Sequence, residues 1–321
     1  MIDGHIHYAA SLKEERLLKI IEQYRLSGIA LQCIPKAYKI PVEQDAFLFK
    51  RHCPVPVYIF GNLNLTWKEK GSKPAAIARQ LMEMGCTGIK MLEGKPIVRK
   101  FNPIPDFDCP EWEEYWAYLE QQQIPVYMHV NDPPEFWDEE KVSEFAKSAG
   151  WFYDDTYIHN EEQYRQILTV LERHPKLRIL FPHFFFMSGN LARLGRILDT
   201  YSNVYLDITP CVEMYFDLSG QQAAARQFFQ KYQNRICFGT DIGARSVICE
   251  ESVPLSIPES QDRVALITRF LEDGSEYVLR PNYYYQGPGD HVMHGLGLSR
   301  GIRDRIYETN FLHFCRVRGA E

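Results

Sequence analysis

Eight short apolar runs, rich in β-branched and aromatic residues, recur along this chain and are separated by amphipathic stretches. The amphipathic stretches carry apolar residues at helical spacing, and several of them end at Gly or Pro. The runs occupy residues 1–7, 28–35, 57–64, 88–92, 125–130, 178–184, 203–209 and 235–241. Eight strands that alternate with helices in a chain of 321 residues predict an α/β fold, a (β/α)8 TIM barrel. A doubly wound open sheet would also alternate, but no glycine-rich phosphate-binding motif follows the first run.

Three segments are longer than a minimal barrel requires, namely residues 94–110, 131–158 and 242–298. Each follows a predicted strand, so we expect long βα-loop insertions on the C-terminal face of the barrel, where active sites are built. A final C-terminal helix is expected over residues 299–317. Because no repeat or linker-like change of composition interrupts the chain, we expect a single domain over residues 1–321.

Composition argues against several classes of protein. With 24% charged residues and no apolar run of the roughly 18 residues that a membrane span requires, a membrane protein is not expected. The net charge of −6, without a basic stripe, argues against nucleic-acid binding. The eight cysteines are scattered and form no CxxC pair, and no secretory signal is recognisable, so we expect reduced thiols and a cytoplasmic protein.

Ionisable residues inside the predicted strands need an explanation, because a parallel strand buried on both faces is normally apolar. The first strand carries two histidines on the same face, and four other strands carry one such residue each. These residues are His5 and His7, Lys90, His129, His183 and Asp241. In a closed barrel the eighth strand lies beside the first, so Asp241 should lie next to the histidine pair and the other residues across the axis. Each of them alone could be an ordinary core residue, but together these imidazoles and the carboxylate suit a divalent metal, zinc above all.

The order of motifs along the chain resembles the amidohydrolase superfamily. The motifs are DGHIH, GIKM, MHV, FPHF, NVYLDIT, CFGTD and the terminal YETNFLHF. They resemble most the amidohydrolase-related (amidohydrolase 2) branch, which includes aminocarboxymuconate semialdehyde decarboxylase-like enzymes and metal-dependent hydrolases. The resemblance implies a (β/α)8 barrel in which His5, His7, His129 and Asp241 hold the metal. It also implies that His183 lies beside the metal-bound water or the substrate.

Lys90 leaves the number of metals open. In binuclear members of the superfamily a carboxylated lysine on the fourth strand bridges two metals, and the histidines of the fifth and sixth strands bind the second. That arrangement would assign Lys90 as the bridge, with His183 as a ligand. In the mononuclear branch this lysine is not a required ligand, and Lys90 could bind a substrate carboxylate instead. We favour one metal over two.

The expected reaction follows from these residues. A metal-activated water would hydrolyse an amide, ester or lactone type of bond in a small organic molecule, with Asp241 taking a proton and His183 orienting the water or stabilising an oxyanion. The alternative is nonoxidative decarboxylation of an aromatic or enoic acid by the same groups. A metal that is purely structural is disfavoured, because a closed structural site needs no general base.

Other residues are weaker candidates for binding the substrate. Arg245 lies four residues after Asp241, and His291 lies on the long loop after the eighth strand. The basic run at Lys95, Arg99 and Lys100 could also bind an anion, although salt-bridged loops are the commoner role of such residues. By analogy with other barrels, a homo-oligomer is expected.

Overall fold

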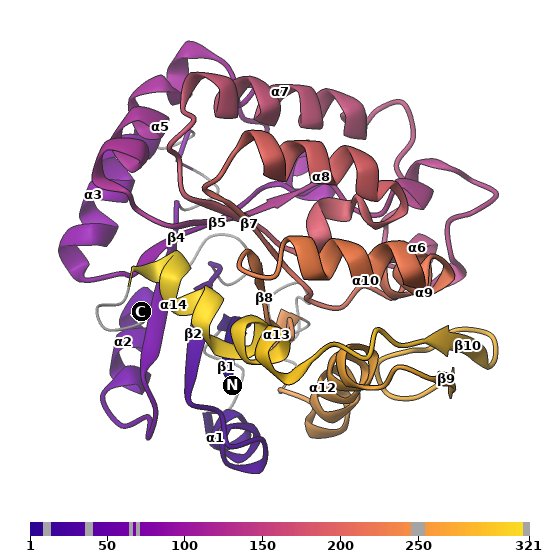
Figure 1. Ribbon diagram of the computed structural model, residues 1–321. Helices are drawn as coiled ribbons and strands as arrows, with labels where there is room; N and C mark the ends of the chain where they lie inside the picture. Colours follow the sequence, from indigo (N-terminus) through magenta and orange to yellow (C-terminus); the bar gives the residue numbers. More distant parts are fainter. Residues whose placement is uncertain (9–13, 36–40, 64–66, 69–70, 245–253, 317–321) are drawn as a thin grey trace.

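The computed structural model describes residues 1–8, 14–35, 41–63, 67–68, 71–244 and 254–316 (Figure 1). Its centre is a sheet of eight strands, all at the positions that the sequence predicts. The strands are β1 (Ile2–Tyr8), β2 (Gly28–Cys33), β3 (Val57–Asn62), β4 (Gly88–Gly94), β5 (Val126–Val130), β6 (Ile179–Phe181), β7 (Val204–Asp207) and β8 (Ile236–Cys237). The predicted α/β class and (β/α)8 fold are confirmed.

The strands are parallel and follow one another around the sheet in sequence order. Backbone hydrogen bonds then connect the last strand region to the first. The amide of Gly4 donates to the carbonyl of Phe238 at 3.0 Å, and the amide of Asp241 donates to the carbonyl of His5 at 2.8 Å. This closure brings the end of the eighth strand beside the histidine pair of β1, as the barrel hypothesis requires.

Helices surround the sheet, one major helix after each strand (Figure 1). They are α1 (Glu14–Gln23), α2 (Glu43–Lys50), α3 (Pro74–Met84), α5 (Pro110–Gln122), α7 (Asn160–Arg173), α8 (Leu191–Thr200), α10 (Gln222–Lys231) and α12 (Ile257–Glu272). The last of these lies inside the segment 242–298, all of which we expected to exceed the needs of the barrel. It packs beside α1, where Gln261 donates to Gln23 at 3.0 Å, so part of this segment is the barrel's own eighth helix.

The remaining elements belong to the long loops. The loop after β4 contains α4 (Pro96–Phe101), and the loop after β5 contains a 3-10 turn, η2 (Pro134–Trp137), and α6 (Glu144–Ser148). Helix α9 (Val212–Gly220) follows β7. After α12, the strands β9 (Glu276–Leu279) and β10 (His291–His294) form an antiparallel hairpin that extends beside this helix (Figure 1).

The C-terminal segment closes the N-terminal end of the barrel. The predicted final helix is present as α13 (Arg300–Asp304), a π-helical turn η5 (Arg305–Thr309) and α14 (Asn310–Cys315). Phe311 and Phe314 from this segment pack in one apolar cluster with strand residues such as Ile2, at the start of β1, and Phe60 of β3. The π-helical turn presents the carbonyl of Ile306 to the amide of Phe238, at 2.9 Å, where β8 ends.

Within the described part of the chain, none of the helices is both long enough and apolar enough to pass through a bilayer.

Candidate metal centre

Two histidines of β1 and one aspartate after β8 form the centre of the site. His5 and His7 are two residues apart on the same strand, so both side chains point to the same side, and their ring centres are 5.0 Å apart. Nε2 of His7 lies 2.8 Å from Oδ1 of Asp241, and Nε2 of His5 lies 3.7 Å from the same oxygen. Their ligand atoms all lie within 4.8 Å of one another, close enough to share one metal ion.

Asp241 is held in its charged form. It has a φ of 59°, an uncommon backbone conformation for a residue other than glycine, which follows from its position in the turn that leaves β8. Burial opposes ionisation, but the hydrogen bond with His7 and the positive charge of Arg263 outweigh it, so the pKa of Asp241 lies well below its ordinary value. Nη1 of Arg263 lies 3.3 Å from Oδ2, which leaves Oδ1 for the histidine side of the site.

The protonation of His5 follows from its partners. Nδ1 of His5 lies 2.9 Å from Oδ2 of Asp207, at the end of β7, and 3.1 Å from the hydroxyl of Thr209. Asp207 also accepts hydrogen bonds from the hydroxyl of Tyr127 and from the backbone amides of His183 and Thr209. A carboxylate can only accept, so Nδ1 of His5 carries the proton and Nε2 keeps its lone pair for the centre.

Lys90 reaches the same point from β4. Its side chain is fully buried, and Nζ lies 3.0 Å from Nε2 of His5. Burial lowers the pKa of Lys90 to about 8, because the charged amine loses its hydration. Lys90 thus lies inside the centre. Its ammonium donates a hydrogen bond to Nε2 of His5, the nitrogen whose lone pair would bind a metal.

His183 approaches from the turn after β6. Nδ1 of its ring lies 3.1 Å from the carbonyl oxygen of Thr209, which can only accept, so Nδ1 carries the proton and Nε2 is the acceptor nitrogen. Burial lowers the pKa of His183 to about 4, so the ring is neutral near pH 7. The ring centres of His183 and His5 are 5.9 Å apart.

The backbone around His183 is strained. His183, Phe184, Phe185 and Phe186 all have positive φ, between 51° and 58°, and this shortens β6 to three residues where the sequence predicts a longer strand. The hydroxyl of Tyr164 donates to the carbonyl of Phe185 at 3.0 Å and lies 3.3 Å from that of Phe186. The ring of Phe185 also stacks on Phe181 at 3.9 Å, so several contacts hold this turn.

His129 lies at the end of β5, farther from the two histidines of β1. Its ring is next to that of His183, at 5.4 Å, but Nε2 faces Oδ1 of Asp132 at 3.3 Å. Two groups of donor atoms within 4.8 Å of one another occur in the described chain, and the one at this centre contains His5, His7 and Asp241 without His129. The assignment of His129 as a ligand therefore stays a prediction.

The structure places the weaker candidates as follows. Arg245 lies outside the described residues. His291 lies on β10 and stacks on Phe216 of α9 at 3.8 Å, a contact that attaches the hairpin to this helix. Lys95 forms an ion pair with Asp132, and Arg99 forms one with Asp106. Lys100 donates a hydrogen bond to the carbonyl of Thr156. All three basic residues therefore have partners within the protein's own loops.

Three acidic residues of the site were missed at the level of sequence. Asp207 orients His5, and Asp132 contacts His129. Asp3 accepts from the amide of His5 and from the hydroxyl of Thr240, so it connects β1 with the residue before Asp241. Burial raises the pKa of Asp3 to about 7. Asp3 and Asp207 lie within the predicted strands, so the rule that singled out the histidines could have found both of them.

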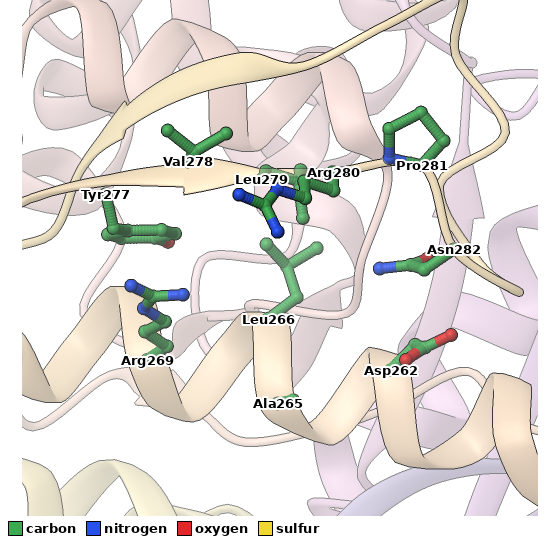
Figure 2. A pocket seen from close by; sticks show the side chains of 10 residues that line it. All are labelled: Asp262, Ala265, Leu266, Arg269, Tyr277, Val278, Leu279, Arg280, Pro281 and Asn282. Atoms are coloured by element: carbon green, nitrogen blue, oxygen red, sulfur yellow. The ribbon is translucent and has the colours of Figure 1, made fainter.

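A separate hollow of about 550 Å³ lies between α12 and β9 (Figure 2). Figure 2 shows Arg269 beneath the ring of Tyr277, with the guanidinium carbon 4.0 Å from the ring centre. None of the residues that line this hollow belongs to the metal centre.

The fold and the donor set together define a metal-dependent enzyme built on a (β/α)8 barrel. The amidohydrolase family model matches residues 43–310, and the chain therefore belongs to the amidohydrolase family. The matched range begins after β1, so the histidine pair of β1 lies outside it. No curated protein matches the chain in a sequence comparison.

Solved structures of low sequence identity share the fold over almost the whole chain. A 2,6-dihydroxybenzoate decarboxylase from Rhizobium is 14% identical, with a TM-score of 0.56 and 99% of both chains covered. A 4-oxalomesaconate hydratase from Rhodopseudomonas palustris is 13% identical, with a TM-score of 0.56 and coverage of 98% of this chain and 95% of the hydratase. A dihydroxybenzoic acid decarboxylase from a Polaromonas species, with bound manganese and 2-nitroresorcinol, is 13% identical, with a TM-score of 0.57 and coverage of 98% and 96%.

Proposed function

We propose that this protein is a metal-dependent hydrolase of a small organic molecule with an amide, ester or lactone type of bond. The observation that carries the proposal is the convergence of His5, His7 and Asp241 next to the acceptor nitrogen of His183. Two imidazoles and a carboxylate are the donor types that bind zinc and similar divalent ions. Three protein donors are also typical of catalytic rather than structural sites, which keep a position open for water or substrate.

The residues of this chain would act as follows. A divalent metal, when bound by His5, His7 and Asp241, lowers the pKa of a coordinated water and polarises the bond to be cleaved. Asp241 is ionised and can accept the proton of the attacking water. His183 is neutral and presents Nε2 as an acceptor, so it can orient the water by accepting a hydrogen bond. A neutral ring in this tautomer has no proton on Nε2, which favours this role over stabilisation of an oxyanion.

Decarboxylation of an aromatic acid is the second candidate. Its support is that two of the structural neighbours named above are decarboxylases of dihydroxybenzoic acids. In this chain the ring of Phe186 stacks on His183, with ring centres 5.0 Å apart, and lies 5.3 Å from His129, so a flat aromatic surface borders the site. A planar substrate could pack against such a surface.

The first test is the metal content of the protein purified without chelators, measured by elemental mass spectrometry. We expect about one divalent metal per chain, a loss of metal in His7→Ala, and no loss in the control His52→Ala, which removes a histidine with an exposed side chain. A protein that takes up neither zinc nor manganese would refute the proposal.

The second test separates the two reactions. The metal-loaded protein is screened with amides, esters, lactones and hydroxybenzoic acids in ¹⁸O-labelled water. Hydrolysis transfers ¹⁸O into the product, whereas release of carbon dioxide without ¹⁸O in the remaining product would establish decarboxylation. Asp241→Asn should abolish either activity, because it removes a metal donor and the proton acceptor together.

A further inference from the structure

The hollow between α12 and β9 is lined by one face of the helix and by the facing strand (Figure 2). On α12, Asp262, Leu266 and Arg269 are four and three residues apart, so they share one face. On β9, Tyr277 and Leu279 are buried and alternate with exposed residues. The volume of about 550 Å³ is typical of sites for small organic ligands.

The hydroxyl of Tyr277 lies in this hollow without a hydrogen-bond partner. Tyr277 is only 5% exposed, and none of the described residues donates to its hydroxyl oxygen or accepts from it. Burial raises the pKa of Tyr277 to about 12, so the hydroxyl keeps its proton at neutral pH. A buried polar group is normally satisfied by protein, water or ligand, so this hydroxyl points to an occupant of the hollow.

Two guanidinium groups lie near this hydroxyl and have donors available. The guanidinium carbon of Arg269 is 4.0 Å from the centre of the Tyr277 ring, and its Nε is 3.9 Å from Oδ2 of Asp273. Nε of Arg280 is 3.8 Å from Oδ2 of Asp290. Both ion pairs are longer than a hydrogen bond and lie at exposed positions, so they hold the arginines only weakly. The N–H groups of both arginines can therefore donate to an acceptor in the hollow.

Asn282 presents another donor at the opposite end of the hollow (Figure 2). Its Oδ1 accepts hydrogen bonds from the backbone amides of Tyr284 and Tyr285, at 2.9 Å and 2.7 Å. These two amides fix the orientation of the side chain, so its NH₂ group lies on the other side and points into the hollow. Oδ2 of Asp262, at the same end, accepts the amide of Tyr283 at 2.8 Å.

The charged lining of the hollow is cationic, although the protein as a whole is acidic. The ten lining residues include two arginines and one aspartate, a balance of +1, whereas the chain carries a net charge of −6. Leu266 and Leu279, which are 4% and 9% exposed, form an apolar floor between the two ends. Guanidinium groups at one end and an apolar floor beside them suit a carboxylate or phosphate that is attached to a small apolar body.

We propose that the hollow between α12 and β9 is a second ligand site, which binds a small organic anion. Its carboxylate or phosphate would lie among Arg269, Tyr277 and Arg280, and its apolar part would cover Leu266. None of these residues belongs to the metal centre, so this site does not depend on the function proposed above.

An anion in this hollow would join α12 to the hairpin of β9 and β10. Both elements hold Arg263, whose Nη1 lies 3.3 Å from Oδ2 of Asp241. Arg263 belongs to α12, and its guanidinium carbon lies 4.3 Å from the ring centre of Tyr284, which belongs to the loop of the hairpin. Occupation of the hollow would therefore stabilise the arrangement that places Arg263 beside the metal centre.

The first measurement is binding of small fluorinated probes, followed by ¹⁹F NMR. The probes are 4-fluorobenzoate and 4-fluorophenyl phosphate, with 4-fluorobenzamide as the neutral match. The protein is His7→Ala treated with a chelator, so that a metal at the other site binds none of them. We expect at least one anion to bind about tenfold more tightly than the amide, and the better anion identifies the group that the site prefers. An amide that binds as tightly as the anions, or two anions that both fail to bind at millimolar concentrations, would overturn the inference.

The second measurement locates the bound probe. Arg280→Gln should weaken its binding about tenfold or more, and Tyr277→Phe about threefold to tenfold, because each removes a donor to the anion. Arg300→Gln is the control, because Arg300 is 88% exposed and pairs with Asp304 at 3.7 Å, much as Arg280 is 80% exposed and pairs with Asp290. An unchanged affinity in either test variant, or an equal loss in Arg300→Gln, would overturn the inference. Metal content is measured separately, so a protein without metal would count against the proposed function alone.

Discussion

The carboxylate of Asp207 lies 2.9 Å from Nδ1 of His5, although the two residues are 202 positions apart in the chain. This contact fixes the imidazole so that its other nitrogen faces Asp241 and Lys90. The same carboxylate also accepts a hydrogen bond from the backbone amide of His183 at 2.9 Å, so Asp207 holds both His5 and His183 in place.

The first prediction concerns this carboxylate. Asp207→Asn should weaken Zn²⁺ binding by about 10–100-fold, because an amide has one acceptor oxygen for four donors and no longer enforces the Nδ1–H form of His5. Competition titration measures the loss. Asp199→Asn is the control, since this aspartate pairs with Lys231 on the surface. An unchanged affinity for Zn²⁺ in Asp207→Asn would show that the contact between Asp207 and His5 does not affect metal binding by His5.

The second prediction concerns the pH dependence of stability. Burial raises the pKa of Glu93 from 4.5 to about 7, so in the folded state this carboxyl holds its proton to a higher pH than in the unfolded chain. Its contribution to the free energy of unfolding therefore falls as pH rises from about 4.5 to about 7, and stays low above that. Glu93→Gln removes this penalty, and should stabilise the protein by about 1–3 kcal/mol at pH 8 and by almost nothing at pH 4.5.

Urea unfolding at the two pH values checks this sign. The difference between variant and unmutated protein isolates Glu93 from other groups with shifted pKa values, such as Asp3. Glu111→Gln, at an exposed position of α5, should show no such dependence on pH. A Glu93→Gln variant that is stabilised more at pH 4.5 than at pH 8 would contradict the assignment.

The third prediction concerns the attachment of the C-terminal helix. Nη1 of Arg178 lies 2.7 Å from the carbonyl of His313 and 3.3 Å from that of Phe314, at the end of α14. Arg178→Ala removes the charged donor from these carbonyls, so we expect a loss of about 1–3 kcal/mol in the free energy of unfolding. Arg316→Ala, which removes an exposed arginine nearby, should cost less than about 0.5 kcal/mol. Equal effects in the two variants would argue against a specific role of Arg178.

The fourth prediction concerns the strained turn after β6. Tyr164→Phe removes the hydroxyl that bonds the carbonyls of Phe185 and Phe186, and should cost about 1–2 kcal/mol of stability. Because His183 begins the same turn, its ring signals in NMR spectra should shift or broaden as well. Tyr118→Phe, on α5, is the control and should leave the His183 signals in place. Unchanged His183 signals in Tyr164→Phe would mean that the turn is held by its aromatic contacts alone.

Strand positions could be predicted well, whereas strand ends could not. β6 stops at Phe181, and after Pro182 the four residues 183–186 adopt positive φ, which no apolar pattern indicates. β8 contains two residues, and its next amide, that of Phe238, bonds to the π-helical turn near the C-terminus. The position of α12 as the eighth barrel helix was likewise hidden within a long segment, because a helical pattern alone does not show which neighbour the helix packs against.

The proximity of His5, His7 and Asp241 could be predicted because it depends on two regular features. Strand alternation places His5 and His7 on one side, and closure of the barrel brings β8 beside β1, so Asp241 must lie near them. Lys90 and His183 follow from the same geometry. The position of Asp132 does not, because it lies in a loop whose path includes Asn131 at a φ of 69°, and loop conformations of this kind are not encoded by a periodic pattern.

The sequence by itself determined the alternation of strands and helices and the set of polar side chains that point into the barrel, because both depend on local periodicity. Only the tertiary structure decided which nitrogen of each histidine is free. That choice depends on whether a particular oxygen lies within hydrogen-bonding distance, and the oxygens of Asp207, Thr209 and Asp132 reach the rings of His5, His183 and His129 only after strands and loops have packed.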